Sequence, residues 1–143
     1  MSPLVSVVVP TCNRDRELRQ ALDAILVQPV DLEILLVEDG PPGPAGAVAA
    51  QLGDSRLRLL RNVGRRGAAA TRNVGVEAAR GRWLAFCDDD DLWAPDKLPA
   101  QLAGLDRCAG WSCTAEITVD SDLQVTAHQR LSREGIDFWL TPM

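Results

Sequence analysis

The chain has 143 residues, of which 46% are hydrophobic and 24% are charged. This length and composition predict one compact domain with enough apolar residues to form a core, and they exclude a disordered chain. Fifteen Lys and Arg residues against twenty Asp and Glu residues leave a formal charge of −5. Nucleic-acid binding is therefore not expected, because contacts to phosphates need clustered positive charge.

The N-terminal segment carries no signal for export or membrane insertion. Its apolar stretch is only a few residues long before Pro10, and no basic residues precede it. The four cysteines form no C-x-x-C pair and give no indication of a zinc site or of an oxidising compartment. We expect a soluble cytoplasmic domain without a transmembrane segment.

Strand and helix patterns alternate along residues 3–107. Short runs of β-branched and aliphatic residues predict strands, and apolar residues three or four positions apart predict helices. In chain order we expect a buried strand at Val5–Val9, a helix carrying Leu18, Leu22 and Ile25 and capped by Asn13 or Asp15, a buried strand at Leu32–Val37, a short helix at Ala47–Leu52, a strand at Leu57–Leu60, a helix at Ala68–Arg80 with Gly81 as its C-cap, a buried strand at Trp83–Cys87, and a helix that Pro95 opens.

The pattern changes after the last of these helices. From Trp111 onward the period is two, which predicts a strand to about Val119, a turn at Asp120–Asp122 and an antiparallel return strand. The preceding alternation predicts right-handed βαβ units. We therefore expect an α/β, Rossmann-like single domain with a mostly parallel sheet flanked by helices over residues 3–107 and an antiparallel extension over residues 108–143.

Ligands of such sheets bind outside the carboxyl ends of the parallel strands. This rule selects the segments that directly follow the expected strands. They are residues 10–14, residues 38–40, residues 61–67 and residues 88–91. We expect these four segments to converge on one crevice.

Four consecutive aspartates, Asp88–Asp91, follow the last strand of the expected parallel sheet. Carboxylates held together beside a buried strand repel one another unless a cation offsets their charge. Hard carboxylate oxygens suit Mg²⁺, Mn²⁺ or Ca²⁺, although the run lacks the spacing of an EF-hand loop. The sequence therefore predicts a divalent metal site, and a merely solvated acidic run is the alternative.

A basic segment precedes the acidic run. Eight arginines and a single acid, Glu77, lie between Arg56 and Arg82. Arg65 and Arg66 stand between two glycines at the start of a helix, and Arg72 lies in its first turns, so backbone amides and guanidinium groups form a candidate phosphate site. A basic loop beside a metal-binding cluster suggests a diphosphate bridged by the cation. Neither a dinucleotide fingerprint nor a P-loop sequence is present.

Asp39 ends the second expected strand and has two interpretations. Its carboxylate can accept hydrogen bonds from a base N–H or a ribose hydroxyl, or it can cap the loop that follows. Spacing alone does not decide between the two.

These segments together resemble the family 2 glycosyltransferases, the inverting GT-A class that uses nucleotide-diphospho-sugar donors. The match covers about residues 5–105, the nucleotide-binding portion of such enzymes. The matching segments, in family order, are Val5–Arg14 (VSVVVPTCNR), Ile34–Gly40 (ILLVEDG), Arg61–Gly64 (RNVG) with Ala70–Gly75 (ATRNVG), and Leu84–Leu98 (LAFCDDDDLWAPDKL).

The resemblance implies roles for individual residues. Asp39 would contact the base, and Asp90 would be the first metal ligand, for Mn²⁺ or Mg²⁺. Asp88 would bind the ribose, the metal or a metal-bound water, and Asp89 and Asp91 are alternatives for either aspartate. Arg72 would lie at the nucleotide, and Pro10, Thr11 and Asn13 would line its pocket. The family's usual Asp-Asp-Gly-Ser is Glu38-Asp-Gly-Pro41 here, so a uridine base is not assumed.

The general base that the family uses follows the metal motif on the acceptor half. Candidates in this chain are Glu116, Asp120, Asp122, Glu134 and Asp137, none of them in a recognisable acidic motif, so the catalytic base is not identified. The acceptor, whether saccharide, lipid or protein, and the oligomeric state are likewise not specified. Three hypotheses follow: a glycosyltransferase domain, a nucleotide-sugar-binding module without transfer activity, and an interaction domain that has lost the ligand.

Overall fold

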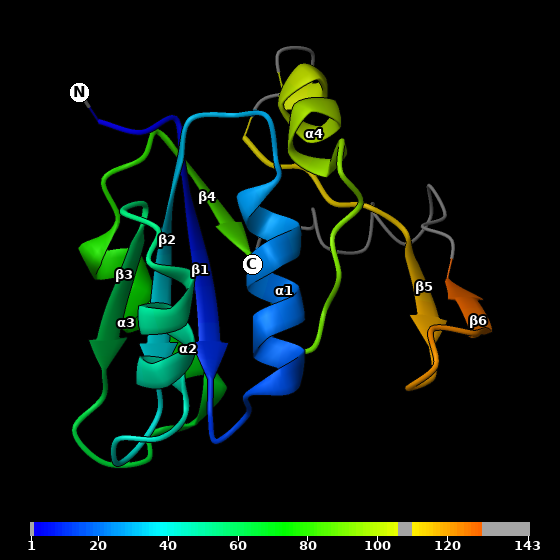
Figure 1. Cartoon of the computed structure of the whole chain (residues 1–143). Coiled ribbons are helices and arrows are strands. Elements are labelled where there is room, and N and C mark those ends of the chain that lie inside the picture. Colours follow the sequence, from blue (N-terminus) through cyan, green and yellow to red (C-terminus); the bar gives the residue numbers. More distant parts are fainter. Residues whose placement is uncertain (1, 106–109, 130–143) are drawn as a thin grey trace, which may run out of the picture. The chain divides into compact units, whose positions relative to one another are not determined.

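The computed structural model describes residues 2–105 and 110–129, which fall in two compact units, residues 1–99 and 100–143 (Figure 1). The two units are described separately. Strands and helices alternate through the first unit, as the sequence predicts. The elements are β1 (Val5–Thr11), α1 (Arg16–Leu26), β2 (Leu32–Glu38), α2 (Ala45–Leu52), β3 (Leu57–Arg61), α3 (Gly67–Ala78) and β4 (Trp83–Phe86), followed by α4 (Lys97–Leu105).

The four strands of the first unit form one parallel sheet in the order β3-β2-β1-β4. The chain moves outward from β1 to β3 and then crosses back to β4 on the other side of β1. Right-handed crossovers place α1 and α2 on one face and α3 on the opposite face, where α3 contacts β1 and β2 (Figure 1). The direction of winding therefore reverses between β1 and β4, and such a switch point is where open α/β sheets bind ligands.

The two central strands form the core. All seven residues of β1 and all seven of β2 are buried, which confirms the predicted buried strands. Helix α1 buries Leu18, Ala21, Leu22 and Ile25, and Asp15 caps it by accepting a 2.6 Å hydrogen bond from the amide of Arg16. Of the two cap candidates, Asp15 is the one the structure uses.

Helix α3 approaches the sheet closely through a glycine. A Cβ atom at Gly75 would lie 2.4 Å from Val8 Cγ1 on β1, well inside van der Waals contact. The absence of a side chain at Gly75 thus sets how near α3 lies to β1.

The sequence predictions are wrong at two places in this unit. Helix α3 ends at Ala78 because Ala79 is extended, with ψ 143°. Gly81 is therefore no C-cap, and a Cβ there would lie 2.5 Å from the backbone nitrogen of Ser6. Strand β4 is not buried: Leu84 is 44% exposed and Phe86 is 49% exposed. Among the described residues 2–105 and 110–129, this strand lies at the edge of the sheet. The sequence pattern mispredicts the burial of β4 because hydrophobicity alone does not reveal that a strand has only one neighbour.

The second unit contains the predicted antiparallel hairpin, formed by β5 (Glu116–Val119) and β6 (Val125–Gln129). Asp120 holds its turn by accepting hydrogen bonds from the amides of Asp122 (3.0 Å) and Gln124 (2.9 Å). The first strand begins at Glu116, later than the sequence pattern suggests.

Candidate functional site

The sheet register aligns the carboxyl ends of three strands. Thr11 of β1 lies opposite Glu38 of β2, and Glu38 lies opposite Arg61 of β3. The amide of Cys87 donates to the carbonyl oxygen of Val8, so the acidic run emerges beside the last residues of β1. A cleft of about 320 Å³ opens at this edge and is lined by Pro10, Thr11, Cys12, Arg14, Asp39, Ala68, Thr71, Arg72, Asp88, Asp89 and Asp90.

Two arginines and a threonine bind carboxylates of the acidic run. Asp89 is 8% exposed and accepts a 2.7 Å hydrogen bond from the Thr11 hydroxyl. Arg14 forms an ion pair with Asp90 and lies 3.3 Å from Asp89 Oδ1. Arg72, on α3, forms an ion pair with Asp88. The repulsion expected within the acidic run is thus offset by guanidinium groups from the β1–α1 loop and from α3.

These carboxylates do not form a closed metal cage. Nowhere in the described part of the chain do three His, Cys, Asp or Glu side chains gather in a way that could hold a metal. A Mg²⁺ or Mn²⁺ ion that is shared with a diphosphate needs only one or two carboxylates, since phosphates and waters complete its coordination. Asp88 and Asp90, with side chains 48% and 49% exposed, fit such an open site.

Asp39 caps the start of α3. Its carboxylate accepts hydrogen bonds from Asn62 Nδ2 at 3.0 Å and from the amides of Arg66 and Gly67 at 2.9 Å each. The hydrogen bond from Asn62 and those from the two amides lower the pKa of Asp39 below its ordinary value. Asp39 therefore caps α3 and not the loop directly after it, and its contact with a base or a ribose stays a prediction.

Two residues that the sequence analysis did not single out support Asp39. Asn62 is 6% exposed and Thr71 is fully buried, and Asn62 Nδ2 also donates to Thr71 Oγ1 at 2.9 Å. The Thr71 hydroxyl in turn donates to the carbonyl oxygen of Gly67 at 2.8 Å. Asn62 and Thr71 both belong to the motifs quoted above, but only the folded chain shows that they face one another.

Glu38 organises the Gly-Pro loop that follows β2. Its carboxylate is almost fully buried and accepts 2.8 Å hydrogen bonds from the amide of Gly43 and from Arg61 Nε. The longer side chain of Glu38, where the family usually has Asp, thus reaches both the loop and β3. The loop is held close: a Cβ at Gly43 would lie 2.9 Å from Glu38 Oε1.

The cleft brings together most of the predicted site residues. Its lining includes Pro10, Thr11, Asp39, Arg72, Asp88 and Asp90. Asn13, Arg65 and Arg66 are exposed and lie outside this lining. The side chain of Arg65 lies over Gly40, and Arg66 contributes its backbone amide to Asp39. Arg14, which belongs to the selected segment 10–14 but received no role of its own in the sequence analysis, is part of the lining and follows the same strand end as Thr11.

The catalytic-base candidates divide between described and undescribed residues. Glu116, Asp120 and Asp122 lie in the second unit, where Asp120 holds the hairpin turn. Glu134 and Asp137 lie outside the described residues.

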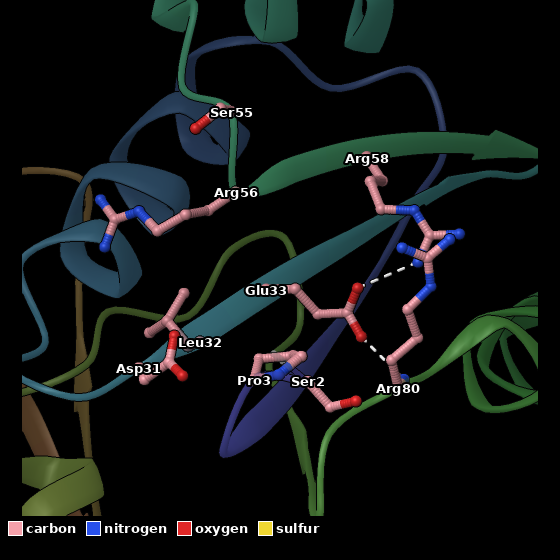
Figure 2. Close-up of a pocket in the computed structure, with 9 residues that line it drawn as sticks. All are labelled: Ser2, Pro3, Asp31, Leu32, Glu33, Ser55, Arg56, Arg58 and Arg80. Carbon is pink, nitrogen blue, oxygen red and sulfur yellow. Dashed lines mark hydrogen bonds and ion pairs between the residues drawn. The ribbon is translucent and has the colours of Figure 1, made fainter.

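A larger hollow of about 510 Å³ lies at the opposite, amino-terminal ends of the strands (Figure 2). Glu33 accepts hydrogen bonds there from the Ser6 hydroxyl and the Arg80 amide, both at 2.7 Å, and from Arg58 at 2.9 Å. This carboxylate ties β2 to β1, to β3 and to the segment before β4. None of the predicted site residues lines this hollow.

The family model described as glycosyl transferase family 2 matches residues 6–135 of the chain. The chain therefore belongs to glycosyl transferase family 2. It is similar to the uncharacterized glycosyltransferase EpsJ of Bacillus subtilis, with 38% identity over 94 residues, or 64% of this chain and 27% of that protein.

A second relative carries a named activity. The chain is 33% identical over 101 residues to WfgD of Escherichia coli, a UDP-Glc:alpha-D-GlcNAc-diphosphoundecaprenol beta-1,3-glucosyltransferase. The match covers 70% of this chain and 40% of that protein. The chain thus spans less than half the length of either relative.

Solved structures confirm the GT-A fold. The mannosyltransferase PcManGT of Pyrobaculum calidifontis, in complex with GDP-Man and Mn²⁺, superposes with a TM-score of 0.67 at 26% identity, over 84% of this chain and 36% of that chain. TarS of S. aureus, in complex with UDP-GlcNAc, gives a TM-score of 0.67 at 20% identity, over 83% of this chain and 40% of that chain, and supports the fold alone.

A membrane-spanning helix is not found among residues 2–105 and 110–129, since none there is long and apolar enough.

Proposed function

We propose that this chain is the donor-binding part of a glycosyltransferase that holds a nucleotide-diphospho-sugar through a divalent metal and transfers the sugar with inversion. The observation that carries the proposal is one cleft at the β1/β4 switch point that contains Asp39, Arg72 and the first three aspartates of the acidic run. Family membership and the GDP-Man and Mn²⁺ bound to PcManGT support it.

In this proposal, different residues of the cleft bind different parts of the donor. The base would lie at Asp39, beside Pro10, Thr11 and Asn13. Arg72 would pair with the diphosphate, and Arg65 and Arg66 would add positive charge at the start of α3, where anions are favoured. Asp88 would accept from the ribose or bind the metal, and Asp90 would bind the metal.

The reaction itself would be a single displacement at the anomeric carbon. When bound, the divalent metal would stabilise the negative charge on the departing diphosphate. Arg72 would add a second positive charge beside the same group. A carboxylate would remove the proton of the acceptor hydroxyl, and Glu116, Asp120 and Asp122 are the described candidates. The acceptor would be a saccharide, a lipid or a protein.

A second candidate function is a nucleotide-sugar-binding module without transfer activity. The observation that favours it is that Asp120, one of the described candidates for the general base, is engaged in the hairpin turn, where it accepts hydrogen bonds from the amides of Asp122 and Gln124. In either case we propose a cytoplasmic location, since the free thiols of Cys12, Cys87 and Cys113 suit a reducing compartment.

Isothermal titration with GDP and UDP, each with and without Mn²⁺, tests the binding site. We expect Mn²⁺-dependent binding that Asp90→Ala weakens at least about tenfold, since a metal ligand is lost. Asp23→Ala, the same change on the exposed side of α1 where Asp23 pairs with Arg19, is the control and should bind as the wild type does. Absence of metal-dependent binding in the wild type would leave the interaction-domain hypothesis.

Turnover of the donor separates the two ligand-binding candidates. Release of free sugar from a nucleotide-diphospho-sugar, by slow hydrolysis or by transfer, supports the transferase. Binding of the nucleotide with no sugar ever released supports the binding module.

A further inference from the structure

Arg14 lies between two carboxylates of the acidic run, in the cleft where the proposed function puts a metal. It forms an ion pair with Asp90 and lies 3.3 Å from Asp89 Oδ1. The other oxygen of Asp89 is bound to Thr11. From the β1–α1 loop, the guanidinium thus offsets part of the negative charge of both carboxylates.

This ion pair is on the open side of the cleft. The side chains of Arg14 and Asp90 are 44% and 49% exposed, whereas that of Asp89 is 12% exposed. Neither partner of the Arg14–Asp90 pair is packed in place, so the pair can separate at little cost. Asp89, in contrast, stays fixed by its buried hydrogen bond to Thr11.

A guanidinium that pairs with Asp90 weakens the binding of a divalent cation to the same exposed carboxylate. Two cations on one carboxylate repel each other, and each donor of Arg14 occupies one of the about four lone pairs that the carboxylate offers. A bound diphosphate changes this balance because it offers Arg14 other acceptor oxygens close by.

Building on the proposed function, we propose that Arg14 is an internal counter-cation that competes with the divalent metal for Asp90. It offsets part of the negative charge of the acidic run and weakens the binding of metal alone. When a nucleoside diphosphate binds, Arg14 moves from Asp90 to the phosphates, so the metal binds more tightly with the nucleotide than without it.

The test is a titration of the 143-residue chain with Mn²⁺ alone, followed by a titration with Mn²⁺ in the presence of saturating GDP or UDP. We expect Arg14→Gln to bind Mn²⁺ alone about two- to fivefold more tightly, the range of an exposed ion pair. The same variant should gain less from added nucleotide than the wild type gains. Arg14→Lys keeps the positive charge, so its affinity for Mn²⁺ should lie between that of the wild type and that of Arg14→Gln.

Two controls isolate the effect. Arg19→Gln removes the same charge from α1, where Arg19 pairs with Asp23 at 2.9 Å, and should leave Mn²⁺ affinity unchanged. In an Asp90→Asn background, the gain from Arg14→Gln should disappear.

The outcomes separate the inference from the function on which it rests. Suppose that the wild type binds Mn²⁺. If Arg14→Gln does not increase the affinity for Mn²⁺, or if Arg14→Lys increases it as much as Arg14→Gln does, only the role of Arg14 is overturned. If neither the wild type nor any of the variants binds Mn²⁺, with or without nucleotide, the proposed function is overturned and the inference with it.

Discussion

The hydroxyl of Thr11 donates a 2.7 Å hydrogen bond to Asp89 Oδ2, joining the end of β1 to the acidic run 78 residues further along the chain. Both residues are buried, at 4% and 8% exposure. The bond fixes the acidic run at the switch point of the sheet. It also distinguishes Asp89 from Asp88 and Asp90, whose side chains are about half exposed and remain open to a ligand.

Replacing Thr11 by valine should destabilise the fold by about 1–3 kcal/mol, because a buried carboxylate loses its hydrogen-bond donor. Urea unfolding followed by circular dichroism measures this change. Thr11→Ser keeps the hydroxyl and should recover most of the loss. Equal stability of Thr11→Val and the wild type would show that the bond contributes nothing to the fold.

Adding one methyl group at Gly75 should cost about 1–3 kcal/mol of unfolding free energy, because the new Cβ would lie 2.4 Å from Val8 Cγ1. The matched control is Gly104→Ala on α4, where a Cβ would have no atom within 4 Å. That change should be neutral or stabilise by up to about 1 kcal/mol, since alanine favours helix. Val8→Ala combined with Gly75→Ala should restore part of the stability, and no recovery would argue against the contact.

The stability of the protein should depend on pH through Glu33. Burial favours a raised pKa for this carboxyl, but hydrogen bonds from Ser6, Arg80 and Arg58 and the charge of Arg58 hold the pKa below its ordinary value of 4.5. A folded-state pKa below the unfolded one means that the ionised group stabilises the protein above pH 4.5 and that this stability is lost as the pH falls through the folded-state pKa.

Urea unfolding of the wild type and of Glu33→Gln across this range tests the dependence. At about pH 7 the variant should be about 1–3 kcal/mol less stable, because Arg58 and the Arg80 amide lose their ionised acceptor. The difference should narrow below pH 4.5. A difference that stays constant from neutral to acid pH would mean that the charge of Glu33 is not what stabilises this end of the sheet.

Much of the fold follows from local sequence patterns. Residues 5–9 and residues 32–37 are nearly continuous apolar runs, interrupted only by Ser6 and Glu33, and this pattern is typical of a strand buried on both faces. Leu18, Leu22 and Ile25 repeat at the helical period and are all buried in α1. The alternation of such segments is enough to predict a parallel sheet, since βαβ connections have one hand.

The exposed edge strand and the end of α3 could not be predicted in the same way. Leu84 and Phe86 are as hydrophobic as core residues, but their exposure depends on which strands lie beside β4. Gly81 resembles a helix cap in sequence, whereas its role is set by Ser6, a residue 75 positions away in the chain. Both errors concern neighbours that are distant in sequence.

The sequence by itself determined the family, the order of the elements and the polar segments that follow each strand, because motif residues and periodicity are local properties. Only the tertiary structure decided how the charges pair: Arg14 with Asp90, Arg72 with Asp88, Thr11 with Asp89, and Asp39 with Asn62 and the start of α3. These pairings depend on strand register and on the close approach of α3 at Gly75. The sequence placed a basic segment before the acidic run, and the folded chain shows that Arg14 and Arg72 are the arginines that pair with it.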